Sequence, residues 1–199
     1  DGGALIAGSL AGGGTTPTLD FGEGLVLDSI NTARDLYVAR LDRDLEPVWA
    51  TRLGGTDDEF LVGLVREADG RVMLGLDYRG DTDLGEADVP SLPEGGDFAL
   101  ALAELDPDSG TVSWARGYGA PMFGGGLTVA ADGDLLVTGD FSDDADIGLG
   151  RLQSASDSDA FVARFARDGT PRWMVPFPAV TSDFRAVLGA PDGGAIAAI

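Results

Sequence analysis

The chain has 199 residues, 34 of them acidic and 13 basic, and its formal net charge is −21. This charge disfavours nucleic acid, whose binding depends on phosphate neutralisation, and it disfavours anionic membrane surfaces. The sequence contains no His and no Cys and no Lys, which excludes Ser-His-Asp and Cys-His catalytic sets, disulfides, Walker-type phosphate loops and Schiff bases.

Short apolar runs separated by glycines and acidic turns predict β-strands along the whole chain. No window shows a convincing helical period, and the 31 glycines argue against helices. Thirteen strands are expected in chain order, at residues 4–7, 36–41, 48–53, 61–65, 72–78, 98–105, 112–118, 127–130, 135–141, 160–165, 172–175, 185–188 and 195–199.

The strands belong to a repeating series with a period of roughly 60 residues, which is typical of arrays, solenoids and propellers. Successive copies begin at Asp-Gly dipeptides at residues 1, 69, 132 and 192. We name the four strands of a unit a, b, c and d, with the Asp-Gly turn joining a to b. The expected units are 1–58 (strands b-c-d), 59–121, 122–181 and 182–199 (strands a-b).

Four strands per unit predict an all-β fold, a β-propeller with four-stranded antiparallel blades. Runs such as 100–103 and 135–137 are apolar without alternation, as expected for strands covered on both faces. Thirteen strands make just over three blades, whereas a closed propeller has roughly four to eight. Residues 1–199 are therefore expected to be one segment of a larger propeller, processed or truncated, that does not behave as a self-sufficient closed monomer.

The series resembles the bacterial β-propeller repeat called the SBBP repeat. The segments that carry this resemblance are 20–22, 36–42, 49–50, 53–55 and 57–59. The pattern Ala103, Asp106, Gly110 and Trp114 is also similar to quinoprotein-type propellers, in which the Trp docks one blade onto the next. The first resemblance implies a secreted or cell-surface bacterial protein, with a periplasmic location as the alternative.

Trp49, Trp114 and Trp173 occupy equivalent places, 10 or 11 residues after the Ala of strand c. Exposed tryptophans also serve as carbohydrate-binding platforms. Regular placement on an apolar strand favours packing instead, because a large aromatic ring buries extensive surface. All three rings are expected to be largely buried against a neighbouring blade.

Acid-rich loops between strands b and c are the candidate calcium sites, because hard cations prefer clustered oxygen ligands. The candidate ligands are Asp81, Asp83, Asp144 and Asp146. Asp20, Asp83 and Asp146 each precede an apolar residue and Gly. The interpretation we favour for these three is a hydrogen bond to the backbone of their own turn. No cofactor is required by any motif, and calcium stays an open possibility.

The missing catalytic chemistry favours a non-enzymatic secreted or cell-surface scaffold that binds a protein or glycan surface, or further copies of the same chain. Two alternatives remain: a structural subunit of an extracellular assembly, and a carboxylate-dependent, calcium-assisted polysaccharide hydrolase or lyase. Acid pairs such as Asp57-Asp58 and Asp143-Asp144 could perform acid/base chemistry, but such pairs usually lie on solvated loops. Two carboxylates that converge at one end of the ring would favour an enzyme. Acidic side chains scattered over the outside would favour the scaffold. No membrane insertion is expected, because the longest uncharged stretch, residues 2–19, is rich in Gly and Thr.

Overall fold

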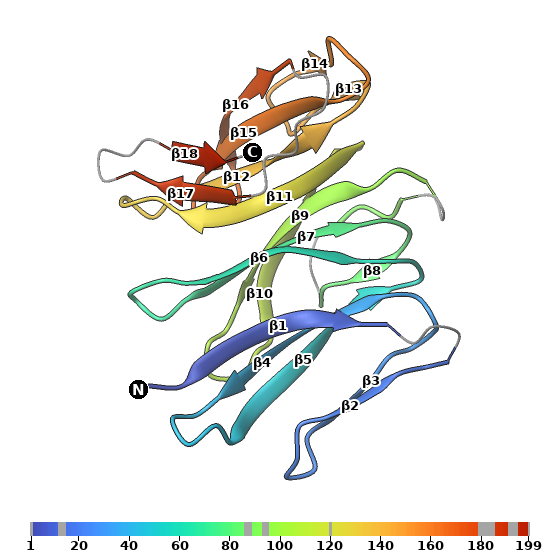
Figure 1. The fold of residues 1–199 in the computed structure, drawn as a ribbon, viewed down its shortest axis with the longest axis vertical. Helices are drawn as coiled ribbons and strands as arrows, with labels where there is room; N and C mark the ends of the chain where they lie inside the picture. Colours follow the sequence, from blue (N-terminus) through green and yellow to red (C-terminus); the bar gives the residue numbers. More distant parts are fainter. Residues whose placement is uncertain are drawn as a thin grey trace.

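The computed structural model of the protein describes residues 2–11, 15–85, 89–92, 96–119, 121–178, 186–190 and 195–198. These residues form strands and turns in antiparallel sheets, without a helix. Figure 1 shows three larger sheets stacked one on another, from the N-terminal sheet to the C-terminal sheet. The predicted all-β class is therefore confirmed. A closed ring is not seen among the described residues.

The first sheet joins β1 (Ala4–Leu10), β4 (Asp35–Leu41) and β5 (Pro47–Gly55), and the end of β5 also pairs with β8 (Thr82–Asp83). The second sheet contains β6 (Phe60–Arg66), β7 (Val72–Tyr78), β9 (Ala99–Leu105) and β10 (Val112–Tyr118). The third contains β11 (Met122–Val129), β12 (Leu135–Phe141), β15 (Asp159–Phe165) and β16 (Pro171–Phe177). A strand pair of β17 (Ala186–Gly189) and β18 (Ala195–Ala198) lies beside the third sheet.

The strand order a-b-c-d is observed in the second and third sheets, and b-c-d and a-b are observed at the two ends. Five short strands were not predicted, because elements of two or three residues leave no periodic pattern. They are β2 (Thr18–Asp20), β3 (Val26–Asp28), β8, β13 (Asp144–Ala145) and β14 (Leu152–Gln153). All five lie in segments between strands b and c, on one side of the stack (Figure 1).

The dipeptides Asp69-Gly70 and Asp132-Gly133 form hairpins between strands a and b, as predicted, whereas the expected turn at residues 192–193 lies outside the described residues. The Gly133 N–H donates to the Ala130 carbonyl at 2.9 Å, and the Ala130 N–H donates to the Asp134 carbonyl at 2.8 Å. Gly133 has a φ of +87°, a conformation that glycine adopts without a Cβ penalty. The turn therefore has three residues rather than the two of the tightest hairpins.

Two apolar cores form between the sheets, because each strand contributes side chains to both of its faces. All seven residues of β7 are buried. Alternate residues point to opposite faces of a strand, so Leu74 packs toward the first sheet and Met73 toward the third. The inner strands also approach closely: a Cβ at Gly63 would lie 2.8 Å from the Cβ of Leu127 on β11. The sheets are thus held together by apolar burial on both sides of the middle sheet.

The part of the chain that the structure describes contains no helix with the length and apolar character needed to cross a membrane.

Candidate functional site

The tryptophans lie on the outer strand of each sheet, on the face that points toward the following sheet. Trp49 on β5 is 6% exposed, and its Nε1–H donates to the Pro107 carbonyl at 3.0 Å. Its ring covers Gly110 in the β9–β10 hairpin, where a Cβ would collide with the indole. Trp49 therefore joins the first sheet to the second.

Trp114 on β10 makes the corresponding contact with the third sheet. A Cβ at Gly169, in the β15–β16 hairpin, would lie 2.9 Å from the Trp114 ring and 2.6 Å from the Tyr118 hydroxyl. Tyr118 donates a hydrogen bond of 2.6 Å to the Gly169 carbonyl, and the Trp114 indole N–H donates to Glu104 at 2.9 Å. The Trp114 ring is half-buried, less deeply than predicted.

Trp173 departs from the prediction that all three rings are largely buried. It is 36% exposed on β16, and its neighbour on the same face, Val175, is 44% exposed. The physical reason is that burial of this position depends on a hairpin from the following sheet. Among the described residues, no such hairpin lies over Trp173.

The four predicted calcium ligands lie in two separate loops and have protein partners. Asp81 accepts a hydrogen bond from the Ser91 hydroxyl, and Asp144 forms an ion pair of 3.0 Å with Arg151. Among the described residues, no three acidic side chains gather in a way that could hold a metal ion. Calcium binding by Asp81, Asp83, Asp144 and Asp146 stays a prediction.

Three aspartates cap their own turns, as the favoured interpretation of their Asp-x-Gly pattern predicts. The Asp20 carboxylate accepts from the Gly22 N–H at 2.8 Å, and Asp83 accepts from Gly85 at 2.9 Å. Asp146 accepts from Gly148 at 2.7 Å and from Gly150 at 3.1 Å. These hydrogen bonds fix the backbone of the turns that follow the short strands β2, β8 and β13.

A pair of carboxyl groups converges inside the junction between the first and second sheets. Asp35 at the start of β4 and Glu59 just before β6 are both fully buried. Asp35 Oδ2 accepts from the Ser29 hydroxyl at 2.5 Å, and Glu59 Oε1 accepts from the Thr82 hydroxyl. Asp35 Oδ1 and Glu59 Oε2 have no hydrogen-bond donor, and both lie where a Cβ at Gly54 would sit.

Arg52 lies beside this pair, with its Nη1 3.5 Å from Asp35 Oδ1, which is close enough for charge compensation but lacks hydrogen-bond geometry. Burial, with smaller contributions from Asp35 and Asp58, raises the pKa of Glu59 to about 8. Glu59 is therefore mostly a neutral carboxylic acid at neutral pH. The sequence did not predict this pair, because Asp35 and Glu59 are far apart in the chain. The one local signal is the Gly54-Gly55 dipeptide, since a side chain at Gly54 would collide with both carboxyl groups.

A second buried carboxyl group, Asp77 on β7, links the second sheet to the third. It accepts a hydrogen bond of 2.8 Å from the Gly124 N–H on β11. Burial raises the pKa of Asp77 well above its usual range, and Asp140 adds to the shift. The Asp77 carboxyl group therefore stabilises the contact between the second and third sheets through this hydrogen bond.

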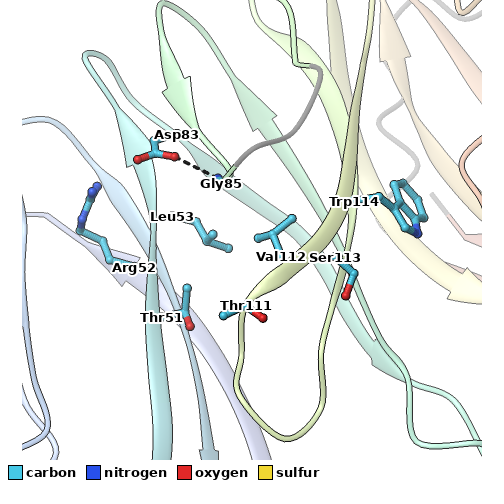
Figure 2. A pocket seen from close by; sticks show the side chains of 9 residues that line it. All are labelled: Thr51, Arg52, Leu53, Asp83, Gly85, Thr111, Val112, Ser113 and Trp114. Carbon is cyan, nitrogen blue, oxygen red and sulfur yellow. Dashed lines mark hydrogen bonds between the residues drawn. The ribbon is translucent and has the colours of Figure 1, made fainter.

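An outer groove of about 570 Å³ lies between β5 and β10 (Figure 2). Leu53 and Val112 face one another across it, and Asp83 and Arg52 stand at one side. The Trp114 ring points away from the groove. The groove lies along the boundary between two packed sheets. Its carboxylate, Asp83, already accepts a hydrogen bond from the Gly85 N–H.

A smaller hollow of about 290 Å³ lies between the second and third sheets, near the segments that join strands b to c and d to a. The Phe123 ring is 42% exposed at this hollow and contacts the buried Phe98 ring at a centroid distance of 4.7 Å. Carboxylates and a hydroxyl complete the lining: Asp97, Asp140 and Ser142. An accessible aromatic ring beside acids and a hydroxyl is a surface that can bind a ligand with both apolar and hydrogen-bonding parts.

Comparison of the chain with protein-family models and with curated proteins finds no match. The resemblance to the SBBP repeat therefore rests on the sequence motifs themselves.

Proposed function

We propose that this chain is a segment of a β-propeller that serves as a non-enzymatic interaction scaffold in a secreted or cell-surface bacterial protein. The a-b-c-d strand order and the face-to-face stacking of the sheets support the propeller assignment. The motifs shared with the SBBP repeat support the location.

The environment of the converging carboxyl groups supports a role without catalysis. A general acid or base must come within hydrogen-bond reach of its substrate. Asp35 and Glu59 are fully buried beneath Ser29, Thr82 and Gly54. The two carboxyl groups therefore form hydrogen bonds within the junction between two sheets, where a substrate does not reach them.

The observation that carries the binding proposal is the exposed Phe123 ring at the hollow between the second and third sheets. The C–H face of a sugar ring can pack on an aromatic side chain, while sugar hydroxyls donate to carboxylates such as Asp97. The net charge of −21 repels anionic polysaccharides. The proposed ligand class is therefore neutral glycans.

The test is equilibrium binding of the whole chain to neutral and anionic polysaccharides. Phe123→Ala is expected to lower the affinity for a neutral glycan about tenfold, the scale of one aromatic contact. Leu149→Ala, which removes an equally exposed apolar side chain elsewhere, is the matched control and should bind like the parent.

Three results would contradict the proposal: binding that ignores Phe123→Ala, a preference for anionic glycans, or binding only to proteins. Product analysis of the same mixtures covers catalysis. Shortened glycan chains that disappear in Glu59→Gln would establish the hydrolase or lyase alternative.

A further inference from the structure

Three phenylalanine rings lie in contact one after another where the sheets adjoin. The Phe123 ring contacts the Phe98 ring at a centroid distance of 4.7 Å, and the Phe98 ring contacts the Phe60 ring at 5.3 Å. We call these three residues the aromatic row. The hollow between the second and third sheets lies at its Phe123 end.

The aromatic row lies at one end of the stacked sheets because each of its residues stands at the start of a strand. Phe60 is the first residue of β6, Phe98 directly precedes β9, and Phe123 is the second residue of β11. Strands a and c of an antiparallel sheet run in the same direction, so their starts share the end that carries the segments between strands b and c (Figure 1). Phe60 and Phe123 also occupy corresponding places, opposite Asp77 on β7 and Asp140 on β12.

The guanidinium group of Arg34 ends the aromatic row on the side away from the hollow. Its Cζ lies 4.5 Å from the centroid of the Phe60 ring, which is a cation–π contact. Arg34 directly precedes β4 and is partly exposed. Within the part of the chain that the structure describes, the Arg34 side chain forms no hydrogen bond and no ion pair. Its N–H groups therefore remain available as donors.

Arg79 lies over the middle of the row and shows the contrasting case. Its Cζ is 4.7 Å from the centroid of the Phe98 ring. Its Nε donates to Asp57 at 2.8 Å, and its Nη2 donates to Asp58 at 3.2 Å. Asp58 also accepts from the backbone N–H of Arg34 at 2.8 Å, but not from its guanidinium group. Protein carboxylates thus occupy Arg79, whereas Arg34 is held by a ring and keeps its donors.

We propose that Arg34 forms a second subsite of the glycan-binding surface, so that the ligand is a neutral oligosaccharide reaching from Phe123 along the aromatic row to Arg34. This inference rests on the proposed binding of neutral glycans at Phe123. One sugar packs on the exposed Phe123 ring. Hydroxyl oxygens of a later sugar accept hydrogen bonds from the Arg34 guanidinium group. Phe60 is a positioning residue, because its ring holds that group in place.

Two subsites on one surface make binding depend on the length of the glycan. A short oligosaccharide contacts Phe123 alone. A longer one contacts Arg34 as well, and the second contact is then intramolecular, which raises the overall affinity without loss of the first. Asp97 at the hollow and Asp58 beside Arg34 disfavour a ligand with carboxylates of its own.

Calorimetric titration of the whole chain with oligosaccharides of a neutral glucan and a neutral mannan, in order of length, tests the second subsite. Long oligosaccharides should bind the parent about tenfold more tightly than short ones, the scale of a hydrogen bond to a charged group. Arg34→Met keeps an apolar side chain over Phe60 and removes the donors. It should abolish the gain with length and leave the binding of short oligosaccharides unchanged. Phe123→Ala should weaken the binding of both.

Arg43→Met is the matched control, because it makes the same change of net charge at an exposed arginine in the β4–β5 hairpin. It should bind every oligosaccharide like the parent. Parent-like binding of all lengths by Arg34→Met overturns the second subsite but not the proposed function, provided that Phe123→Ala still weakens binding. Equal losses for short and long oligosaccharides in Arg34→Met also overturn it. Failure of every neutral oligosaccharide to bind the parent contradicts the proposed function and this inference together.

Discussion

At the scale of single residues, Glu59 couples folding of the protein to pH. Its pKa is about 8 in the folded protein and 4.5 without the fold. Between these values the folded state keeps a proton that the unfolded state has released. The free energy of unfolding therefore falls as pH rises from about 4.5 to about 8, and this contribution levels off above that range.

Glu59→Gln should remove this pH dependence, because the amide keeps an acceptor for Thr82 and cannot ionise. We expect the variant to be more stable than the parent at pH 8.5 by about 4–5 kcal/mol, with a much smaller difference at pH 5. Urea unfolding at both pH values measures this. Glu46→Gln, at an exposed site, serves as control and should match the parent; equal effects of Glu59→Gln at both pH values would refute the assignment.

Leu45 stores backbone strain in the isolated protein. Leu45→Gly should stabilise the dilute monomer by about 1 kcal/mol, because glycine adopts positive φ without a Cβ clash. Gly169→Ala, at the equivalent position, should do the opposite, since its φ is +78° and a Cβ meets Trp114 and Tyr118. Thermal unfolding at low protein concentration compares the two. Stabilisation by both changes would show that φ does not control this site.

At the scale of elements, the same tryptophan position has different energetic consequences in different sheets. Trp49→Ala removes a buried ring and should cost about 3–5 kcal/mol. Trp173→Ala changes an exposed ring on an equivalent strand and should cost under about 1 kcal/mol in the dilute monomer. Chemical denaturation of both variants measures the difference. Equal losses would mean that Trp173 is covered in the monomer.

The loop between β13 and β14 offers a test of its capping aspartate against the calcium prediction. Asp146→Asn keeps the oxygen that accepts from Gly148, so it should fold like the parent. Asp146→Ala should lose about 1 kcal/mol, the scale of one hydrogen bond. Melting temperatures with calcium and with chelator at equal ionic strength complete the comparison. A calcium-dependent rise in the parent that both variants abolish would assign Asp146 as a metal ligand.

At the scale of the whole molecule, 34 acidic and 13 basic residues give a large negative net charge. Repulsion between these charges destabilises the compact folded state. Raising sodium chloride from about 0.01 to 0.1 M shortens the screening length from about 30 to about 10 Å. We expect the melting temperature to rise with this change and the transition to become sharper at higher protein concentration, as association grows. A sharp, concentration-independent monomer transition would contradict the expectation that these residues do not form a self-sufficient unit.

The strands and their order within each sheet follow from the sequence, because the signals that define them are local. Apolar runs such as that of β7 and Asp-Gly turns such as Asp132-Gly133 lie within a few residues of the hydrogen bonds that they determine. The capping role of Asp20, Asp83 and Asp146 is equally local, since each accepts from an N–H two residues along the chain. Short ribbons such as β2–β3 were missed because two or three residues have no period.

Tertiary structure decided what each repeated position touches. Trp49 and Trp173 occupy equivalent places in the repeat, yet one is buried and the other exposed, because burial depends on the neighbouring sheet and not on the strand itself. Asp35 and Glu59 likewise meet only because β4 and β6 belong to adjoining sheets. Desolvation by that meeting raises the pKa of Glu59, and no property of residues 57–59 alone could have indicated it.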